Sequence, residues 1–235
     1  MRRLILKLTP TTDSIPGLKV SNAYLVQADS GELALIDSGM PGNAKRISDF
    51  LTMRGIDPKS LTLILLTHPD LDHSGSVWEL KEKYAPNARV AIHEDDAPRL
   101  SGEKKLKEVK GATGLMMGIM GSFLKFHPIK PDIILKDQEM IAGLQTIHTP
   151  GHTQGSVCFY NEKEKVLFSG DTLITDSNKN VIYSGKSMSY DLEMTKKSVA
   201  NKLKDLDFDL LFPGHGPPIT SGASAKVRAV IENTE

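Results

Sequence analysis

Four short turns that contain Gly or Pro constrain this chain most, because each carries His or Asp beside apolar or β-favouring runs. The turns are Thr67–Gly75, Thr149–Thr153, Ser169–Thr172 and Phe212–Gly216. Imidazoles and carboxylates together form the ligand set of divalent zinc, iron or manganese. Tight turns at strand ends fix side-chain directions, which a metal site requires. Seven such residues in four turns exceed the needs of one metal ion and suit two ions that share a carboxylate.

The first turn is the most specific of the four. Directly after an apolar strand candidate, four residues of metal-ligand type fall within six positions: His68, Asp70, Asp72 and His73. The alternative is an acidic helix-capping loop, in which Asp72 or Ser74 caps the following helix. A cap needs one such residue and not four. Each of the three later turns adds one candidate, in order His152, Asp171 and His215. The combined pattern favours metal ligation.

Strands and helices alternate along the chain without a linker or repeat. The strand candidates are Leu4–Leu8, Ala23–Gln27, Leu33–Asp37, Leu61–Thr67, Arg89–His93, Glu139–Ala142, Leu144–His148, Val157–Tyr160, Lys165–Ser169 and Asp209–Phe212. The helix candidates are Asn43–Arg54, Ser76–Tyr84, Leu192–Leu206 and Ala223–Ile231. Periodicity alone predicts a mixed α and β protein, and 235 residues fit a single domain over residues 1–235.

The composition agrees with a compact soluble enzyme. Lys and Arg balance Asp and Glu at 29 each, so we expect no nucleic-acid or membrane partner. The single cysteine, Cys158, excludes internal disulfides and is predicted to be buried in the core. The basic N-terminal segment, residues 1–8, is interrupted by Lys7 and is predicted to be a strand and not a signal peptide. A cytoplasmic location is the resulting expectation.

With these motifs the chain resembles the metallo-β-lactamase superfamily, whose signature is His-x-His-x-Asp-His followed by a Gly-His-Thr-like turn, a Gly-Asp and a late Gly-His. The resemblance runs from about Val20 to Gly216. Residues 35–39 (Leu-Ile-Asp-Ser-Gly) also resemble the first motif of the family, whose Asp supports the metal loop. The resemblance implies an α+β fold, a four-layer αββα sandwich, and two divalent metal ions. By family the metal is zinc.

The resemblance also implies how the ligands are shared. One ion would take His68, the residue at position 70, and His152; the other would take Asp72, His73 and His215, with Asp171 as the bridge. The chain departs from the family at one position, because Asp70 stands where the family usually has its second His. The simplest interpretation is that Asp70 ligates through a carboxylate oxygen and shifts metal preference towards iron or manganese. The alternative is that Asp70 points away and leaves a single-metal site.

The function implied is hydrolysis of a small ester or thioester by a metal-bound hydroxide, with Asp72 as the catalytic group that orients it. Only twenty residues follow His215, so we expect no C-terminal glutathione-binding domain of the glyoxalase II type. A phosphodiesterase of the same fold is the second hypothesis, supported by acidic residues at position 70 in some relatives. Iron-dependent thiol oxidation and a metal-bearing sensor without turnover are further alternatives.

Segment 96–131 breaks the regular pattern, because its part 110–127 is apolar and rich in Met and Gly. This apolar part, residues 110–127, is too short to cross a bilayer. A lid over the site and a packed helical hairpin or homodimer contact are equally supported. Three other histidines are predicted to lie outside the ligand set: His93 in a cap or at the surface, His127 in an exposed turn, and His148 at a strand end.

Overall fold

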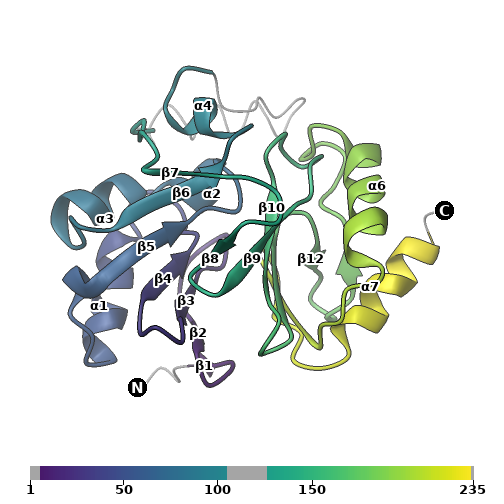
Figure 1. The fold of residues 1–235 in the computed structure, drawn as a ribbon, viewed down its shortest axis with the longest axis horizontal. Helices are drawn as coiled ribbons and strands as arrows, with labels where there is room; N and C mark the ends of the chain where they lie inside the picture. The colour runs from purple at the N-terminus through teal and green to yellow at the C-terminus, as the bar shows by residue number, and fades with distance from the viewer. Residues whose placement is uncertain (1–5, 105–125, 234–235) are drawn as a thin grey trace.

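The structure is a computed structural model that describes residues 6–104 and 126–233, with side chains described from residue 8 (Figure 1). The central part of the predicted lid, including all of its methionines, lies outside these residues. The two ends of that segment contain one short helix, α4, at Ala97–Leu100. Within the described ranges no helix has both the length and the apolar character needed to span a membrane.

The first half of the chain builds a seven-stranded sheet in which the strands follow one another in sequence order. Its strands are β1 (Leu6–Lys7), β2 (Thr12–Ser14), β3 (Tyr24–Gln27), β4 (Leu33–Ile36), β5 (Leu61–Leu65), β6 (Arg89–His93) and β7 (Ile133–Leu135). Strands β1 to β4 are antiparallel, and β4 to β7 are parallel. Parallel neighbours require crossover connections, and α1 (Ala44–Met53) lies in the one from β4 to β5 and α3 (Val77–Lys83) in the one from β5 to β6.

The second half builds a five-stranded sheet of order β14-β11-β10-β9-β8. Its strands are β8 (Met140–Ile141), β9 (Leu144–His148), β10 (Val157–Asn161), β11 (Val166–Gly170) and β14 (Leu210–Pro213). A separate hairpin joins β12 (Ile174–Thr175) to β13 (Val181–Ile182). Strands β9, β11 and β14 run in the same direction, because β10 is antiparallel to both of its neighbours and β11 is parallel to β14.

Four longer helices cover the outer faces of the two sheets (Figure 1). They are α1 (Ala44–Met53), α3 (Val77–Lys83), α6 (Leu192–Leu203) and α7 (Ala223–Glu232). A single helical turn, α2 (Leu71–Ser74), and a 3-10 turn, η1 (Pro58–Ser60), complete the described elements. Figure 1 shows α1 and α3 on one side of the molecule and α6 and α7 on the opposite side.

Three apolar clusters separate the four layers. Along β4, Leu35 faces the cluster under α1 and α3, whereas Ile36 faces the cluster between the two sheets. Along β10, Phe159 joins that same central cluster, and Cys158 joins the third, under α6 and α7. Because successive side chains of a strand point to opposite faces, both sheets are buried on both sides. The predicted α+β, four-layer αββα sandwich is confirmed.

Most predicted elements are present with small shifts of their ends. The predicted helix 76–84 forms as α3, and the predicted helix 192–206 ends early, at Leu203. Strands β2, β7, β12 and β13 were not predicted, since runs of two or three residues carry too little pattern to be recognised. Cys158 is fully buried, as predicted, and burial raises the pKa of its thiol to about 11.

The two sheets meet at the edge where the four turns lie. The backbone N–H of Val157, at the start of β10, donates to Thr67 O at 3.0 Å, and the N–H of Asn22 donates to Gly214 O at 2.7 Å. The turns after β9, β11 and β14 leave the second sheet at a common end, because these strands are parallel. The turn after β5 reaches them from the first sheet. The fold thereby brings together side chains that are up to 147 positions apart in the sequence, from His68 to His215.

Candidate metal centre

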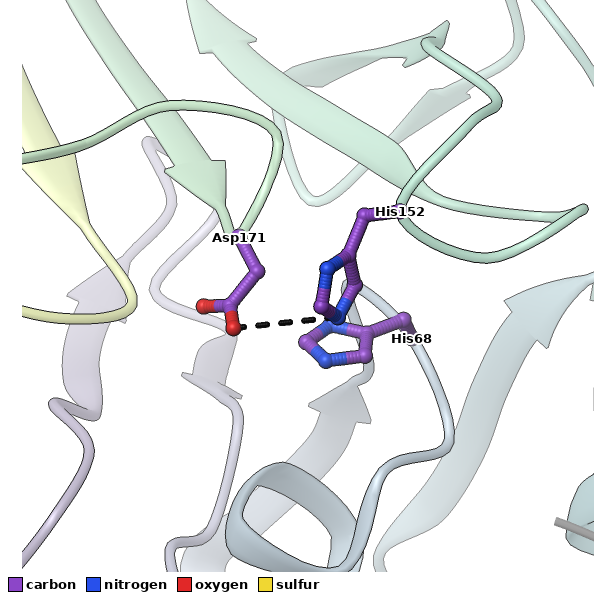
Figure 2. Close-up of side chains that lie close together, drawn as sticks. All are labelled: His68, His152 and Asp171. Atoms are coloured by element: carbon purple, nitrogen blue, oxygen red, sulfur yellow. Dashed lines mark ion pairs between the residues drawn. The ribbon is translucent and has the colours of Figure 1, made fainter. Parts of the chain in front are cut away.

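Side chains from three of the turns converge on one point. The first group that could hold a cation contains His68, His152 and Asp171, all buried (Figure 2). The Nε2 atom of His152 lies 3.7 Å from Asp171 Oδ2. Asp70 faces the same group, because its Oδ2 atom lies 3.2 Å from His152 Nε2 and 3.7 Å from His68 Nε2.

The second group contains Asp72, His73 and His215. The Oδ2 atom of Asp72 lies 3.1 Å from His215 Nε2 and 3.7 Å from His73 Nε2. The carboxylate of Asp171 faces this group as well, with Oδ1 at 3.3 Å from His73 Nε2 and Oδ2 at 3.2 Å from His215 Nε2. Asp171 therefore contacts both groups, and all seven residues singled out in the sequence lie in one cluster.

Asp37 orients the imidazoles that come from the first turn. It is buried and takes a left-handed backbone conformation, with φ at 58°. Its carboxylate accepts from His73 Nδ1 at 2.8 Å and from Thr67 Oγ1 at 2.9 Å. The Thr67 hydroxyl in turn lies 3.0 Å from His68 Nδ1. Because Nδ1 carries a proton in both rings, Nε2 is the atom that each ring presents to a cation.

The other two imidazoles have equivalent supports. The Nδ1 atom of His152 lies 3.1 Å from Ser184 Oγ, and that of His215 donates to the backbone carbonyl of Val20 at 2.9 Å. Val20 holds an unusual left-handed conformation for a β-branched residue, with φ at 79°. Sequence reasoning missed Ser184 and Val20, because neither lies in a recognisable motif and each meets its histidine only through the tertiary fold.

Two buried atoms of the cluster show that the residues fit a cation. Among the described residues, His68 Nε2 and Asp171 Oδ1 are buried side-chain atoms that lack a hydrogen-bond partner. A buried polar atom without a partner destabilises a fold by about 1–3 kcal/mol. A metal ion that accepts lone pairs from both atoms would remove this cost. The donor set, four imidazoles and three carboxylates, is one that zinc, iron and manganese accept.

Gly214 allows the last turn to approach the cluster. A Cβ atom at this position would overlap Asp171 Oδ1 and would lie 2.7 Å from His73 Cε1. Both contacts are too short for a side chain of any size. Glycine is therefore required at position 214 by the close approach of the chain to the candidate centre.

Charge and burial set the protonation of the cluster. Burial, together with the neighbouring His73 and His152, lowers the pKa of His68 to about 3, so this ring is neutral. Burial also disfavours the charged form of His215, but its hydrogen bonds to Asp171 and Asp72 outweigh this and raise its pKa to about 10. Burial disfavours the charged form of His73 as well, but Asp171, Asp72 and Asp37 outweigh it and raise the pKa of this ring well above its usual value. Without a metal ion the cluster therefore favours a proton on His73 and on His215 at neutral pH. A metal ion must displace these protons, so its affinity rises with pH.

The exposed side of the cluster defines where a substrate can approach. The side chains of Asp70, Asp72 and His215 are 22%, 19% and 25% exposed, whereas those of His68 and His152 are 1% exposed. A ligand that arrives from solvent therefore meets Asp70, Asp72 and His215 first. The buried members lie behind them.

The three remaining histidines lie outside the seven-residue cluster. His148 ends β9 and His127 is exposed, as predicted. The prediction for His93 is wrong, because this residue is only 3% exposed and its ring stacks on His148 at 3.9 Å. It ends β6 in the first sheet, where the second sheet covers it. Sequence periodicity does not show that a strand end is covered by a distant segment.

An αββα sandwich with a His and Asp cluster at the common edge of its two sheets defines a class of metal-dependent proteins. The family model of the metallo-beta-lactamase superfamily matches residues 16–215 of this chain. The chain therefore belongs to the metallo-beta-lactamase superfamily. A solved metallo-beta-lactamase family protein from Thermus thermophilus has the same fold, with a TM-score of 0.72 and 26% identity over 97% of this chain and 79% of that one.

The curated relatives of this chain include an uncharacterized protein, a probable metallo-hydrolase and a thioesterase. The chain is 37% identical to YobT of Bacillus subtilis, over 66% of this chain and 63% of that protein. It is 26% identical to the probable metallo-hydrolase YflN of the same organism, over 86% of this chain and 83% of the relative. It is also 26% identical to the acyl-coenzyme A thioesterase MBLAC2 of Gallus gallus, over 67% of this chain and 59% of that protein. The chain thus spans less than two thirds of YobT and of MBLAC2.

Proposed function

We propose that this protein is a metal-dependent hydrolase of a small ester or thioester, with a dinuclear centre held by the seven clustered residues. The main observation behind the proposal is that each imidazole of the cluster is held in a fixed orientation by a neighbouring group. Each of the four imidazoles has its Nδ1 atom fixed by a partner, and the Nε2 atoms of all four face the carboxylates of the cluster. This arrangement directs four lone pairs to one place.

Asp72 is the residue proposed to act on the reacting water. Divalent ions, when bound, supply Lewis acidity and make a bound water more acidic. Burial disfavours the charged form of Asp72, but His73 and His215 outweigh it and lower its pKa, so the carboxylate is ionised at neutral pH. Its partial exposure lets it contact both solvent and the cluster. It can therefore orient the attacking water through a hydrogen bond and accept its proton.

Asp70 makes the two halves of the proposed centre alike. One half has two imidazoles and Asp70, and the other has two imidazoles and Asp72, with Asp171 facing both. Two histidines and one carboxylate form the set that is common in non-haem iron sites. Three carboxylates also neutralise more of the metal charge than two would, so a bound water is less acidic. We propose that the centre accepts iron or manganese in addition to zinc.

The choice of an ester or thioester as the substrate is supported by one curated relative. MBLAC2, a relative over two thirds of this chain, is named as an acyl-coenzyme A thioesterase. A phosphodiesterase remains the second candidate, because Asp70 faces the cluster and acidic residues at this position occur in nuclease-like relatives of the family. Both reactions use the same attack by water and differ in the electrophile, which is carbon in one and phosphorus in the other.

A substrate screen with defined metal content tests the proposal. We expect metal-loaded protein to cleave thioester or ester reporters, and chelation to lower the rate to the uncatalysed level, with recovery on addition of metal. The rates on thioester, lactone and phosphodiester reporters are compared at equal metal content. Turnover of phosphodiesters alone would favour the second candidate. Full activity after complete removal of metal would contradict both.

Replacement of Asp70 by His tests the role of this position. If Asp70 is a ligand, Asp70→His removes one negative charge, lowers the apparent pKa of bound water and moves the rise of the rate to lower pH. The same change increases the preference for zinc over manganese, because a carboxylate is replaced by an imidazole. Competition dialysis and the pH dependence of kcat measure the two effects, with Asp70→Asn as the charge-matched control. An unchanged metal preference in Asp70→His would show that Asp70 is not a ligand.

A further inference from the structure

A second cluster of metal-binding side chains lies where the two sheets meet, apart from the seven residues described above. It contains His93, the last residue of β6, Asp95 two positions later, and His148, the last residue of β9. One ligand atom from each of the three lies within 4.8 Å of the others. The cluster thus joins a strand of the seven-stranded sheet to a strand of the five-stranded sheet.

The distances suit a small transition metal ion. The Oδ2 atom of Asp95 lies 3.7 Å from His93 Nδ1 and 3.8 Å from His148 Nε2. Neighbouring ligand atoms of a tetrahedral zinc ion, with bonds of about 2.0–2.2 Å, lie roughly 3.3–3.6 Å apart. A contraction of a few tenths of an ångström would bring the Asp95 oxygen to this spacing from both nitrogens. Asp95 can supply it, because its side chain is 52% exposed and is free to change rotamer.

The positions of the protons on His93 and His148 determine which hydrogen bonds and protons an ion must displace in order to bind. His93 Nδ1 accepts from the backbone N–H of Asp95 at 3.3 Å, so this atom is deprotonated, and an ion that binds its lone pair must replace this long hydrogen bond. Burial and the adjacent His148 lower the pKa of His93, which keeps its ring neutral. His148 Nε2 donates to Gln154 O at 2.9 Å, so an ion must displace this proton and break this hydrogen bond.

The two rings stack with an angle of 18° between their planes, and one nitrogen of each lies within 4.8 Å of the other. An ion that binds both rings requires His93 and His148 to rotate out of the stacked arrangement, because their lone pairs lie in the ring planes and must point to one position. Charge around the pair favours a cation. The negative charges of Asp95, Glu94 and Asp137 each act to raise the pKa of His93, against the larger effects of burial and His148 that lower it. Of these three carboxylates Lys202 pairs with Asp137, at 2.6 Å.

We propose that His93, Asp95 and His148 form a third metal site, which binds one zinc-class ion and links the two sheets of the sandwich. Two imidazoles and one carboxylate are the ligands that zinc, nickel and copper accept, and solvent completes the coordination. The site has three protein ligands and one of them is half exposed, so it is weaker than the dinuclear centre. It fills after that centre as free zinc is raised.

The test is the metal stoichiometry at increasing free zinc, measured by equilibrium dialysis and elemental analysis. We expect the wild-type protein to bind one zinc ion more than the His93→Gln and His148→Gln variants. Loss of either imidazole should weaken the third site by about 100-fold or more, since loss of an outer-shell partner alone costs 10–100-fold. The comparison is a difference between variants, so it holds whatever the number of ions in the dinuclear centre.

Two further variants keep the test independent of folding defects. Asp95→Asn changes an exposed side chain and should also weaken the extra ion, although the fold is unaffected. His127→Gln is the matched control, because His127 is an exposed histidine that stacks on Trp78 at 4.1 Å, outside the cluster. It should retain the extra ion. Equal stoichiometry in wild type, His93→Gln and Asp95→Asn at millimolar zinc would overturn the proposal, as would loss of the ion in His127→Gln alone.

Discussion

Replacement of Asp171 by Ala is expected to lower the affinity for both metal ions together, by more than about 100-fold each. The physical reason is that the Asp171 carboxylate faces both halves of the cluster, with contacts of 3.2–3.7 Å to His73, His152 and His215. Without it, neither half retains two carboxylates. Elemental analysis after dialysis against a weak chelator measures the effect, and hydrolysis should fall with the metal content.

The control for this variant is Asp176→Ala, five positions further along the chain. Asp176 is half-buried, and its carboxylate accepts hydrogen bonds within its own turn, from Asn178 and Asn180. Its replacement should leave both ions in place. If Asp171→Ala loses one ion and keeps the other at wild-type affinity, Asp171 belongs to one half of the centre and the bridge is wrongly assigned.

Replacement of Asp72 by Asn is expected to lower kcat by at least about 100-fold, with a smaller loss of metal than in Asp171→Ala. Asn retains the size and one oxygen of the side chain but cannot accept a proton. Asp72 is ionised in the structure, because His73 and His215 lower its pKa. The variant therefore removes the proposed proton acceptor but keeps an oxygen that can still ligate a metal ion. Single-turnover rates at matched metal content measure the difference.

Asp49→Asn is the matched control for Asp72→Asn, because Asp49 is an exposed carboxylate paired with Lys45 on α1. An exposed pair of this kind contributes little to stability, so kcat and metal content should stay at the wild-type level. A kcat in Asp72→Asn within a few-fold of wild type, with both ions bound, would show that another group accepts the proton. That outcome would contradict the catalytic role of Asp72 but would remain consistent with a dinuclear centre.

The sequence pattern predicted a mixed α and β protein, the resemblance to a known family predicted the αββα sandwich, and the motifs predicted which residues form the cluster. Alternating apolar runs predicted most of the longer strands, and the His and Asp turns after them predicted which side chains would lie together. This works because a tight turn at the end of a strand restricts the direction of its side chains, and that restriction is local. The helix ends shifted by up to three residues, as at Leu203, because fraying depends on neighbours.

Only the tertiary structure decided how each histidine is held. Ser184 meets His152 across 32 positions, and the Val20 carbonyl meets His215 across 195 positions. Neither contact has a local sequence signal, since a hydroxyl or a carbonyl is available almost anywhere in a chain. Position 70 is a similar case. The residue type was visible in the sequence, but the 3.2 Å approach of Asp70 to His152 depends on two sheets meeting at one edge.

His93 gives the clearest limit of the sequence. Its place at the end of a strand, before three acidic residues, predicted a cap or a surface position. In the fold, β9 ends opposite β6, and His148 stacks on His93 and leaves it 3% exposed. The local pattern determined where the strand ends. Which distant segment covers that end depends on the packing of one sheet against the other, and this packing is a property of the whole chain and not of any short segment.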